Sequence, residues 1–268
     1  MIGFALVLTA GFLRPELDPD VPDPDVPAPV AAPSRTGPPV PVAAVPEPPK
    51  APEPSISSTT VSVPTDLLSL PGAVPVEGAG TFGHAPGRGR ILGTKGPMRR
   101  FRVAVERGGR EDVAVFAAQV ETTLGDKRGW TGGGRLRLQR VGRAQDADFT
   151  IYLATRETAG RMCARGGVNI RVGGRPYTSC RATGKVIINL DRWRLSVDHF
   201  VEAKIPLSLY REYVVNHETG HELGRSHERC PGDGKTAPVM MQQTLFLDGC
   251  KANAWPYVKG RLYRGPLL

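Results

Sequence analysis

The sequence predicts an α+β domain, and three observations support that class. Four short segments are rich in β-branched and other apolar residues, as strands are, and two longer segments repeat apolar residues at helical spacing. The residues after Gly224 contain many turn formers and show neither period. The expected order is a strand, a helix, three strands and a second helix, followed by an irregular C-terminal segment.

The first strand and the first helix are expected between Phe101 and Leu124. Residues 101–106 (FRVAVE) alternate apolar and polar side chains, as a half-buried strand does. Residues 111–124 predict an amphipathic helix, since apolar side chains recur three or four positions apart. These side chains are Val113, Phe116, Ala117, Val120 and Leu124.

Three further strands are expected after a glycine-rich turn at residues 132–134. They cover residues 136–141, 148–154 and 185–190, each short and rich in Leu, Ile or Val. Between the last two, the many glycines predict a loop.

The second long helix is expected to start near Pro206, because proline suits the first helical turn. It passes through Tyr210 and Tyr213 to His217 and His221. Gly224 then lets the chain leave the helix through a left-handed backbone conformation, which is costly for other residues.

The first 77 residues differ in composition from the rest. Residues 1–13 form an apolar run without charge, shorter than the roughly 20 residues that span a bilayer and without a basic start. We interpret this run as part of a membrane anchor in preference to a signal peptide. Residues 14–77 hold most of the 26 prolines and predict a disordered linker, which leaves residues 78–268 as the folded domain.

Charge is divided unevenly between these regions. Residues 1–77 carry 9 acidic and 3 basic side chains, so the domain carries a net charge of +15 within a chain of +9. A basic domain attracts polyanions, and an anionic polymer of the cell envelope is a candidate partner. No nucleic-acid motif accompanies the charge, and nucleic acid is not an expected partner. We expect a monomer.

The four cysteines, Cys163, Cys180, Cys230 and Cys250, all lie in the domain. No C-x-x-C pair occurs, which argues against a cysteine-rich metal site. Four cysteines allow three connectivities, of which Cys163–Cys180 with Cys230–Cys250 is the simplest by proximity. Two disulfides predict an extracytoplasmic protein, either secreted or tethered through its N-terminal segment.

One segment carries candidate chemistry, namely residues 216–228 (NHETGHELGRSHE). Positions four apart share one face of a helix, so His217 and His221 can bind one metal ion. The turn at Gly224 brings His227 back toward the same ion. Three imidazoles leave the fourth position of a tetrahedral zinc ion open, as in catalytic sites.

Glu218 is the expected general base. It follows His217 directly, close enough to reach a water on the metal but not the metal itself. Zinc would activate that water, and Glu218 would accept its proton and pass it to the leaving amine. The expected cofactor is therefore Zn²⁺.

The segment His217–His227 resembles the metzincin motif H-E-x-x-H-x-x-G-x-x-H. That resemblance implies a metzincin-like zincin, with a small twisted mixed sheet, two main helices and an irregular C-terminal subdomain. It also implies a methionine turn beneath the zinc, for which Met240 is the preferred candidate and Met241 the alternative. Tyr257 is a candidate for an additional ligand by its position only.

A second resemblance covers about residues 77–258. Segments such as residues 129–131 (GWT), 237–244 (APVMMQQT) and 249–250 (GC) are similar to an uncharacterised actinobacterial family. That family is exported or membrane-anchored and is grouped with zinc peptidases by its motif. The resemblance implies the fold and the zinc, but no particular substrate.

The expected function is therefore that of an extracytoplasmic zinc metalloendopeptidase acting on a protein or peptide. Two alternatives stay open at this point. One is a catalytically idle zinc module that binds anionic envelope polymers, which the basic charge favours. The other is a zinc amidase acting on peptidoglycan peptides.

Overall fold

A computed structural model describes residues 67–268 of the chain. The N-terminal segment 1–13 and most of the expected linker lie outside the described residues. In chain order the elements are β1 (Phe82–His84), β2 (Ile91–Leu92), β3 (Met98–Glu106), α1 (Val113–Gly125), β4 (Arg137–Arg140), β5 (Phe149–Ala154), α2 (Arg156–Arg165), β6 (Arg171–Val172), β7 (Arg175–Pro176), β8 (Cys180–Ala182), β9 (Lys185–Asn189), α3 (Leu190–Leu195), α4 (Asp198–Glu202), α5 (Leu207–Glu222), β10 (Tyr257–Val258) and β11 (Arg261–Leu262).

One mixed sheet forms the centre of the fold. Its strand order is β2-β4-β3-β5-β9-β8, and β1 pairs with the C-terminal half of β3. The pairs β3–β4, β3–β5 and β5–β9 are parallel, whereas β8 runs antiparallel to β9 at the end of the sheet. The predicted α+β class is confirmed.

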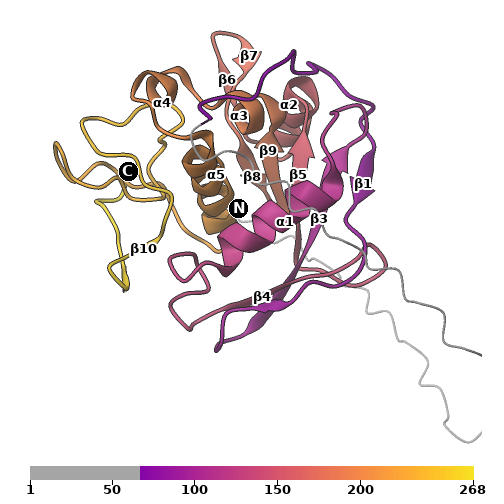
Figure 1. The fold of residues 1–268 in the computed structure, drawn as a ribbon, viewed down its shortest axis with the longest axis horizontal. Coiled ribbons are helices and arrows are strands. Elements are labelled where there is room, and N and C mark those ends of the chain that lie inside the picture. Colours follow the sequence, from indigo (N-terminus) through magenta and orange to yellow (C-terminus); the bar gives the residue numbers. More distant parts are fainter. Residues whose placement is uncertain (1–66) are drawn as a thin grey trace, which may run out of the picture. The chain divides into compact units, whose positions relative to one another are not determined.

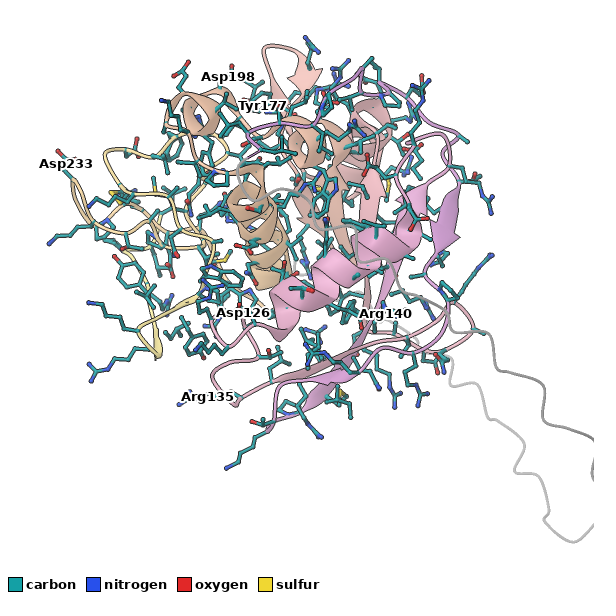
Figure 2. All side chains as sticks on the ribbon, in the orientation of Figure 1. Asp126, Arg135, Arg140, Tyr177, Asp198 and Asp233 are labelled. Carbon is teal, nitrogen blue, oxygen red and sulfur yellow. A yellow bond between two sulfur atoms is a disulfide. The ribbon has the colours of Figure 1, made fainter. Side chains whose placement is uncertain are left out.

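Helices cover both faces of the sheet. Alternate residues of a strand point to opposite faces, so Val186 and Ile188 join the core formed with α1 and α5, whereas Ile187 joins the core formed with α2. Figure 1 shows α1 crossing in front of the strands and the C-terminal segment lying beside α5, away from β1. Arg140, labelled in Figure 2, lies on β4 and donates from Nε to Glu121 of α1 over 2.9 Å.

The six elements expected from the sequence are present, with ends that differ by a few residues. The prediction of a loop between residues 154 and 185 is wrong in its first part, where the chain forms helix α2. Its apolar signal is weak because small residues, such as Ala159 and Gly160, make up much of its buried face. The disulfide Cys163–Cys180 joins this helix to β8. The short helices α3 and α4 were not expected either.

The folded structure also starts earlier than expected. Residues 67–77, which composition assigned to the linker, make backbone hydrogen bonds with the domain. The Leu207 amide donates to Leu67, the Leu70 amide to Arg194 and the Glu157 amide to Val76. Proline content therefore misplaced the start of the domain, because composition does not show the tertiary hydrogen bonds that residues 67–77 make.

Both disulfides occur in the expected pairing, Cys163–Cys180 and Cys230–Cys250. Such bonds persist in oxidising compartments, and they suggest an extracytoplasmic location. Within residues 67–268, no helix combines the length and the apolar character that a membrane span requires.

Candidate metal centre

Helix α5 carries the first part of the site and is buried along most of its length. Three contacts hold its central turns. The Trp130 indole donates to the Asn216 carbonyl over 2.8 Å, and the Asn216 amide donates to the Ala254 carbonyl over 2.9 Å. The Tyr213 hydroxyl donates to the Met241 carbonyl, also over 2.9 Å. These contacts connect α5 to segments before and after it in the chain.

The end of α5 has the geometry expected at Gly224. This glycine has φ +81°, in the left-handed region. Its amide donates to His221 over 3.0 Å, and the Arg225 amide donates to Gly220 over 2.9 Å. This pair of bonds is the Schellman arrangement, which satisfies the last carbonyls of a helix and turns the chain back.

Beyond that turn, His227 meets the two histidines of α5. The Nε2 atom of His221 lies 3.2 Å from that of His217 and 3.0 Å from that of His227. One ligand atom from each ring lies within 4.8 Å of the others, so the three could hold one metal ion. The structure thus brings together the three histidines that spacing alone had selected.

Backbone carbonyls orient two of these rings. His217 Nδ1 lies 2.8 Å from the Val239 carbonyl, and His221 Nδ1 lies 2.8 Å from the Arg225 carbonyl. A carbonyl only accepts, so each Nδ1 carries the proton and each Nε2 presents a lone pair. Lone pairs that converge without a proton between them repel one another, and a cation between them relieves the repulsion.

Burial favours the neutral form of all three rings. It lowers the pKa of His217 well below the usual value, with the neighbouring His221 as the next cause. Burial and His221 together lower the pKa of His227 to about 4, and burial also lowers the pKa of His221. Neutral imidazole is the form that binds metal ions.

Glu218 lies beside the triad and is available for chemistry. Its side chain is buried, and only 6% of the residue is exposed. Among the hydrogen bonds of the described residues, none involves its carboxylate, although it lines the cavity at the triad. Burial raises the pKa of this carboxyl group to about 8.

That cavity has a volume of about 650 Å³ and is open to solvent. Its walls combine the metal-site residues with β8, the segment before β8, the turn after α5 and the segment after Met241. Two arginines, Arg181 of β8 and Arg225 of the turn, line it together with Tyr213. Tyr257 is not among the lining residues; its side chain packs against Gly133 instead.

The two methionines face different parts of the domain. The Met241 amide donates to the Pro238 carbonyl over 3.0 Å, which makes residues 238–241 a tight turn. The Met240 sulfur lies against Gly220 of α5, between the first two histidines in sequence. Met241 packs instead with Ala237 and Cys250. Met241 meets α5 through its carbonyl, which accepts from Tyr213, whereas Met240 places its sulfur against the motif itself.

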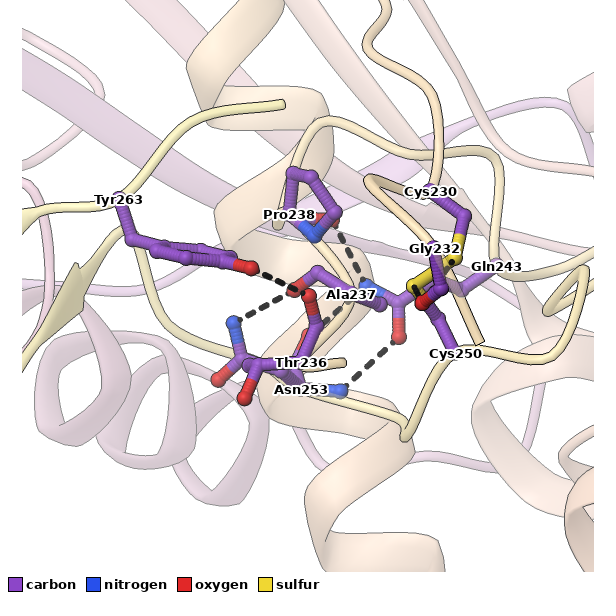
Figure 3. Close-up of a disulfide and its surroundings, with 9 residues drawn as sticks. All are labelled: Cys230, Gly232, Thr236, Ala237, Pro238, Gln243, Cys250, Asn253 and Tyr263. Carbon is purple, nitrogen blue, oxygen red and sulfur yellow. Dashed lines mark hydrogen bonds between the residues drawn. A yellow bond between two sulfur atoms is a disulfide. The ribbon is translucent and has the colours of Figure 1, made fainter. Parts of the chain in front are cut away.

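The segment that follows His227 is held by a disulfide and a polar network, shown in Figure 3. Cys230 and Cys250 close the loop. Behind it, the Gln243 side chain donates to the carbonyls of Pro238 and Asn253, over 3.1 and 2.8 Å. The Asn253 side chain donates to Ala237 over 2.9 Å. These bonds position the turn whose Val239 carbonyl orients His217.

Some contributors to the site were not expected from the sequence. Glu222, the last residue of α5, is buried and accepts from Arg181 over 2.7 Å and from Arg99 over 3.4 Å. Glu228, next to His227, accepts from Arg264 Nε and the Gly265 amide. Neither pairing had a signal in the sequence, because the partners lie 36 to 123 residues away.

Comparison with known families gives one match. A family described as "Protein of unknown function (DUF3152)" matches residues 69–256. This range contains the three histidines, Glu218, both methionines and both disulfides. No curated protein and no solved structure matches significantly.

Proposed function

The chain belongs to the DUF3152 family, and we propose that it is a zinc-dependent peptidase of the metzincin type that acts outside the cytoplasm. The observation that carries this proposal is the convergence of three Nε2 atoms beside an unpaired carboxylate, on the wall of an open cavity. His217, His221 and His227 would be the ligands and Glu218 the general base.

The residues present fit a zinc ion. Zinc–nitrogen bonds of about 2.0–2.1 Å in a tetrahedron place neighbouring nitrogens about 3.3 Å apart. The observed separations of 3.2 and 3.0 Å are close to that value. The Nδ1 contacts to carbonyls are the outer hydrogen bonds that metal-binding histidines usually make.

The roles of the residues follow from their positions. A zinc ion at the triad would supply Lewis acidity and lower the pKa of a bound water. Glu218, whose carboxylate has no partner among residues 67–268, would accept a proton from the attacking water and deliver it to the leaving amine nitrogen. Met240 packs against Gly220 of the helix and would be the methionine of the proposed methionine turn.

The sheet edge favours a peptide as the substrate. Strand β8 is the last strand of the sheet order, and its Cys180 and Arg181 line the same cavity as the triad. An extended peptide can add to such an edge by backbone hydrogen bonds, whatever its side chains. A scissile bond would then lie next to Glu218. The strand proposed to bind the peptide and the residues proposed for the chemistry therefore line one cavity.

One observation supports a second candidate, a non-catalytic module that binds an anionic envelope polymer. The net charge of +15 on residues 78–268 would attract such a polymer. An unpaired Glu218 at the triad is unexplained in a pure binding module, so we place this candidate second.

The test is peptide-library cleavage by the full chain, read by mass spectrometry with and without a zinc chelator. We expect cleavage that the chelator abolishes and zinc restores. Glu218→Gln should keep its zinc and lose about 10²–10⁴-fold in rate, because it removes only the general base. Glu202→Gln, which changes an exposed carboxylate on α4, is the matched control and should cleave normally.

Two results would contradict parts of this proposal. A wild-type protein with full zinc occupancy that cleaves no peptide and no peptidoglycan fragment would support the binding module. Cleavage that Glu218→Gln retains would remove Glu218 from the mechanism.

A further inference from the structure

A second cavity, of about 600 Å³, lies beside β1 and the ends of β3 and β4, away from β8, and shares no lining residue with the first. It is formed where β3 changes partners. The N-terminal half of β3 pairs with β4, and the C-terminal half pairs with β1. The walls are β1 with the turn after it, Arg107 at the end of β3, and the loop of residues 142–145 after β4.

All of the titratable side chains that line this cavity are basic. They are His84, Arg88, Arg107 and Arg143, and no aspartate or glutamate is among the lining residues. The nearest acid along the loop, Asp146, lines a different cavity. The cavity therefore has a positive potential that no carboxylate in its wall offsets.

The three guanidinium groups are also unpaired. None of Arg88, Arg107 and Arg143 forms an ion pair or a side-chain hydrogen bond among the described residues, and all three are exposed. Elsewhere in the domain, arginines such as Arg140 and Arg181 are paired with carboxylates. The cavity arginines keep their donors available for a ligand.

His84 adds an independent observation. Its Nδ1 atom is buried and has no hydrogen-bond partner. Burial lowers the pKa of this histidine, and the positive charges of Arg143 and Arg102 lower it further. Positive charge from β3 and from the loop after β4 therefore acts on a histidine with one buried polar atom, for which nothing in the described chain supplies a partner.

We propose that this cavity binds the phosphate group of a larger phosphorylated ligand. Guanidinium groups match phosphate oxygens with paired N–H donors. Three positive charges are more than one carboxylate would neutralise, which favours a phosphate group as the ligand. A volume of about 600 Å³ is in the range of sites for small organic ligands and exceeds what a bare ion needs. A soluble phosphate ester and a phospholipid headgroup both present this chemistry.

The experiment titrates the full chain with glycerol phosphate and, separately, with vesicles of phosphatidylcholine containing phosphatidylglycerol. Saturable binding is expected in at least one of the two titrations. The titration in which it occurs shows whether the phosphate belongs to a soluble ester or to a lipid headgroup. Arg107→Gln combined with Arg143→Gln should weaken it at least tenfold. Both side chains are exposed, so the double variant should fold normally.

The matched control is Arg175→Gln combined with Arg261→Gln. It removes the same charge from two exposed, unpaired arginines that line none of the described cavities, and it should bind as the wild type does. No saturable binding in either arm, or an equal loss in both double variants, would overturn the proposal in favour of unspecific charge attraction.

This inference does not depend on the proposed hydrolysis. None of the cavity residues lies at the histidine triad, so Glu218→Gln should bind the phosphate ligand as tightly as the wild type. Failure of the peptidase proposal and failure of the phosphate proposal would thus be seen separately.

Discussion

Two buried glutamates show how the surroundings of a residue separate structural from chemical roles. Glu106 is 2% exposed and accepts hydrogen bonds from two backbone amides and two threonine hydroxyls. Glu218 is 6% exposed, and no hydrogen bond of the described residues reaches its carboxylate. A satisfied carboxylate holds its neighbours in place, whereas an unsatisfied one beside a cavity is available to exchange protons.

Glu106→Gln is predicted to destabilise the domain by about 2–4 kcal/mol, because the amide nitrogen would face donors that the carboxylate accepted. Those donors include the Thr155 amide at the start of α2. The measurement is the free energy of unfolding in urea. Glu77→Gln, which removes an exposed ion pair with Arg161, should cost about 1 kcal/mol or less. An equal effect of the two variants would contradict a special role for Glu106.

Among the elements, α5 determines the geometry of the site. It supplies two of the histidines and Glu218, and its last turn directs the chain toward His227. The helix is packed closely at Gly220, where an added Cβ would collide with the Met240 sulfur and lie 2.8 Å from the Trp130 ring. Only glycine allows this approach. The same packing places Met240 under the motif.

Gly220→Ala is therefore predicted to lower the free energy of unfolding by about 1–3 kcal/mol through overpacking, although alanine is the better helix former. It should also weaken metal binding, since Met240 and Trp130 must move. Gly224→Ala is the comparison. An added Cβ there meets nothing within 4 Å, but φ is +81°, so we expect a loss of about 1 kcal/mol from backbone strain. Denaturation curves and zinc titrations would measure both effects.

At the scale of the whole domain, two disulfides support different walls of the cavity. Cys163–Cys180 connects α2 to β8, the strand proposed to bind the peptide. Cys230–Cys250 closes the loop that starts just after His227 and contains Met240 and Met241. The bonds enclose loops of similar size, with sequence separations of 17 and 20 residues. Chain entropy therefore predicts similar contributions to stability.

Replacing either pair by serines should cost about 3 kcal/mol in the free energy of unfolding. The two variants should differ at the site. If the triad binds zinc as proposed, loss of Cys230–Cys250 should weaken that binding, because it loosens the segment after His227 and the turn that orients His217. Loss of Cys163–Cys180 should leave zinc affinity near the wild-type value and mainly raise the KM for peptides. Equal effects on zinc affinity would show that the disulfides act only through global stability.

Much of this domain could be predicted from local patterns. The strand at residues 101–106 and the helix at residues 111–124 follow from the spacing of apolar side chains, which marks a buried face. The other face of the strand, with Ala104 and Glu106, is also buried, which the alternation did not predict. Helix α2 could not be predicted in this way, because the small residues in its buried face give only a weak apolar repeat. The disulfide partners were suggested by proximity alone, and the structure contains them in that pairing.

Local sequence accounts for the histidine spacing, because two positions four apart and a glycine turn are properties of one helix and its end. It also identifies Glu218 as the neighbour of a candidate metal ligand. The surroundings of these residues arise from long-range packing: the carbonyls that orient the rings, the β8 edge, the cavity, and the Arg181–Glu222 pair. Those contacts join residues far apart in the chain, and no local pattern encodes which distant backbone or side chain meets a given residue.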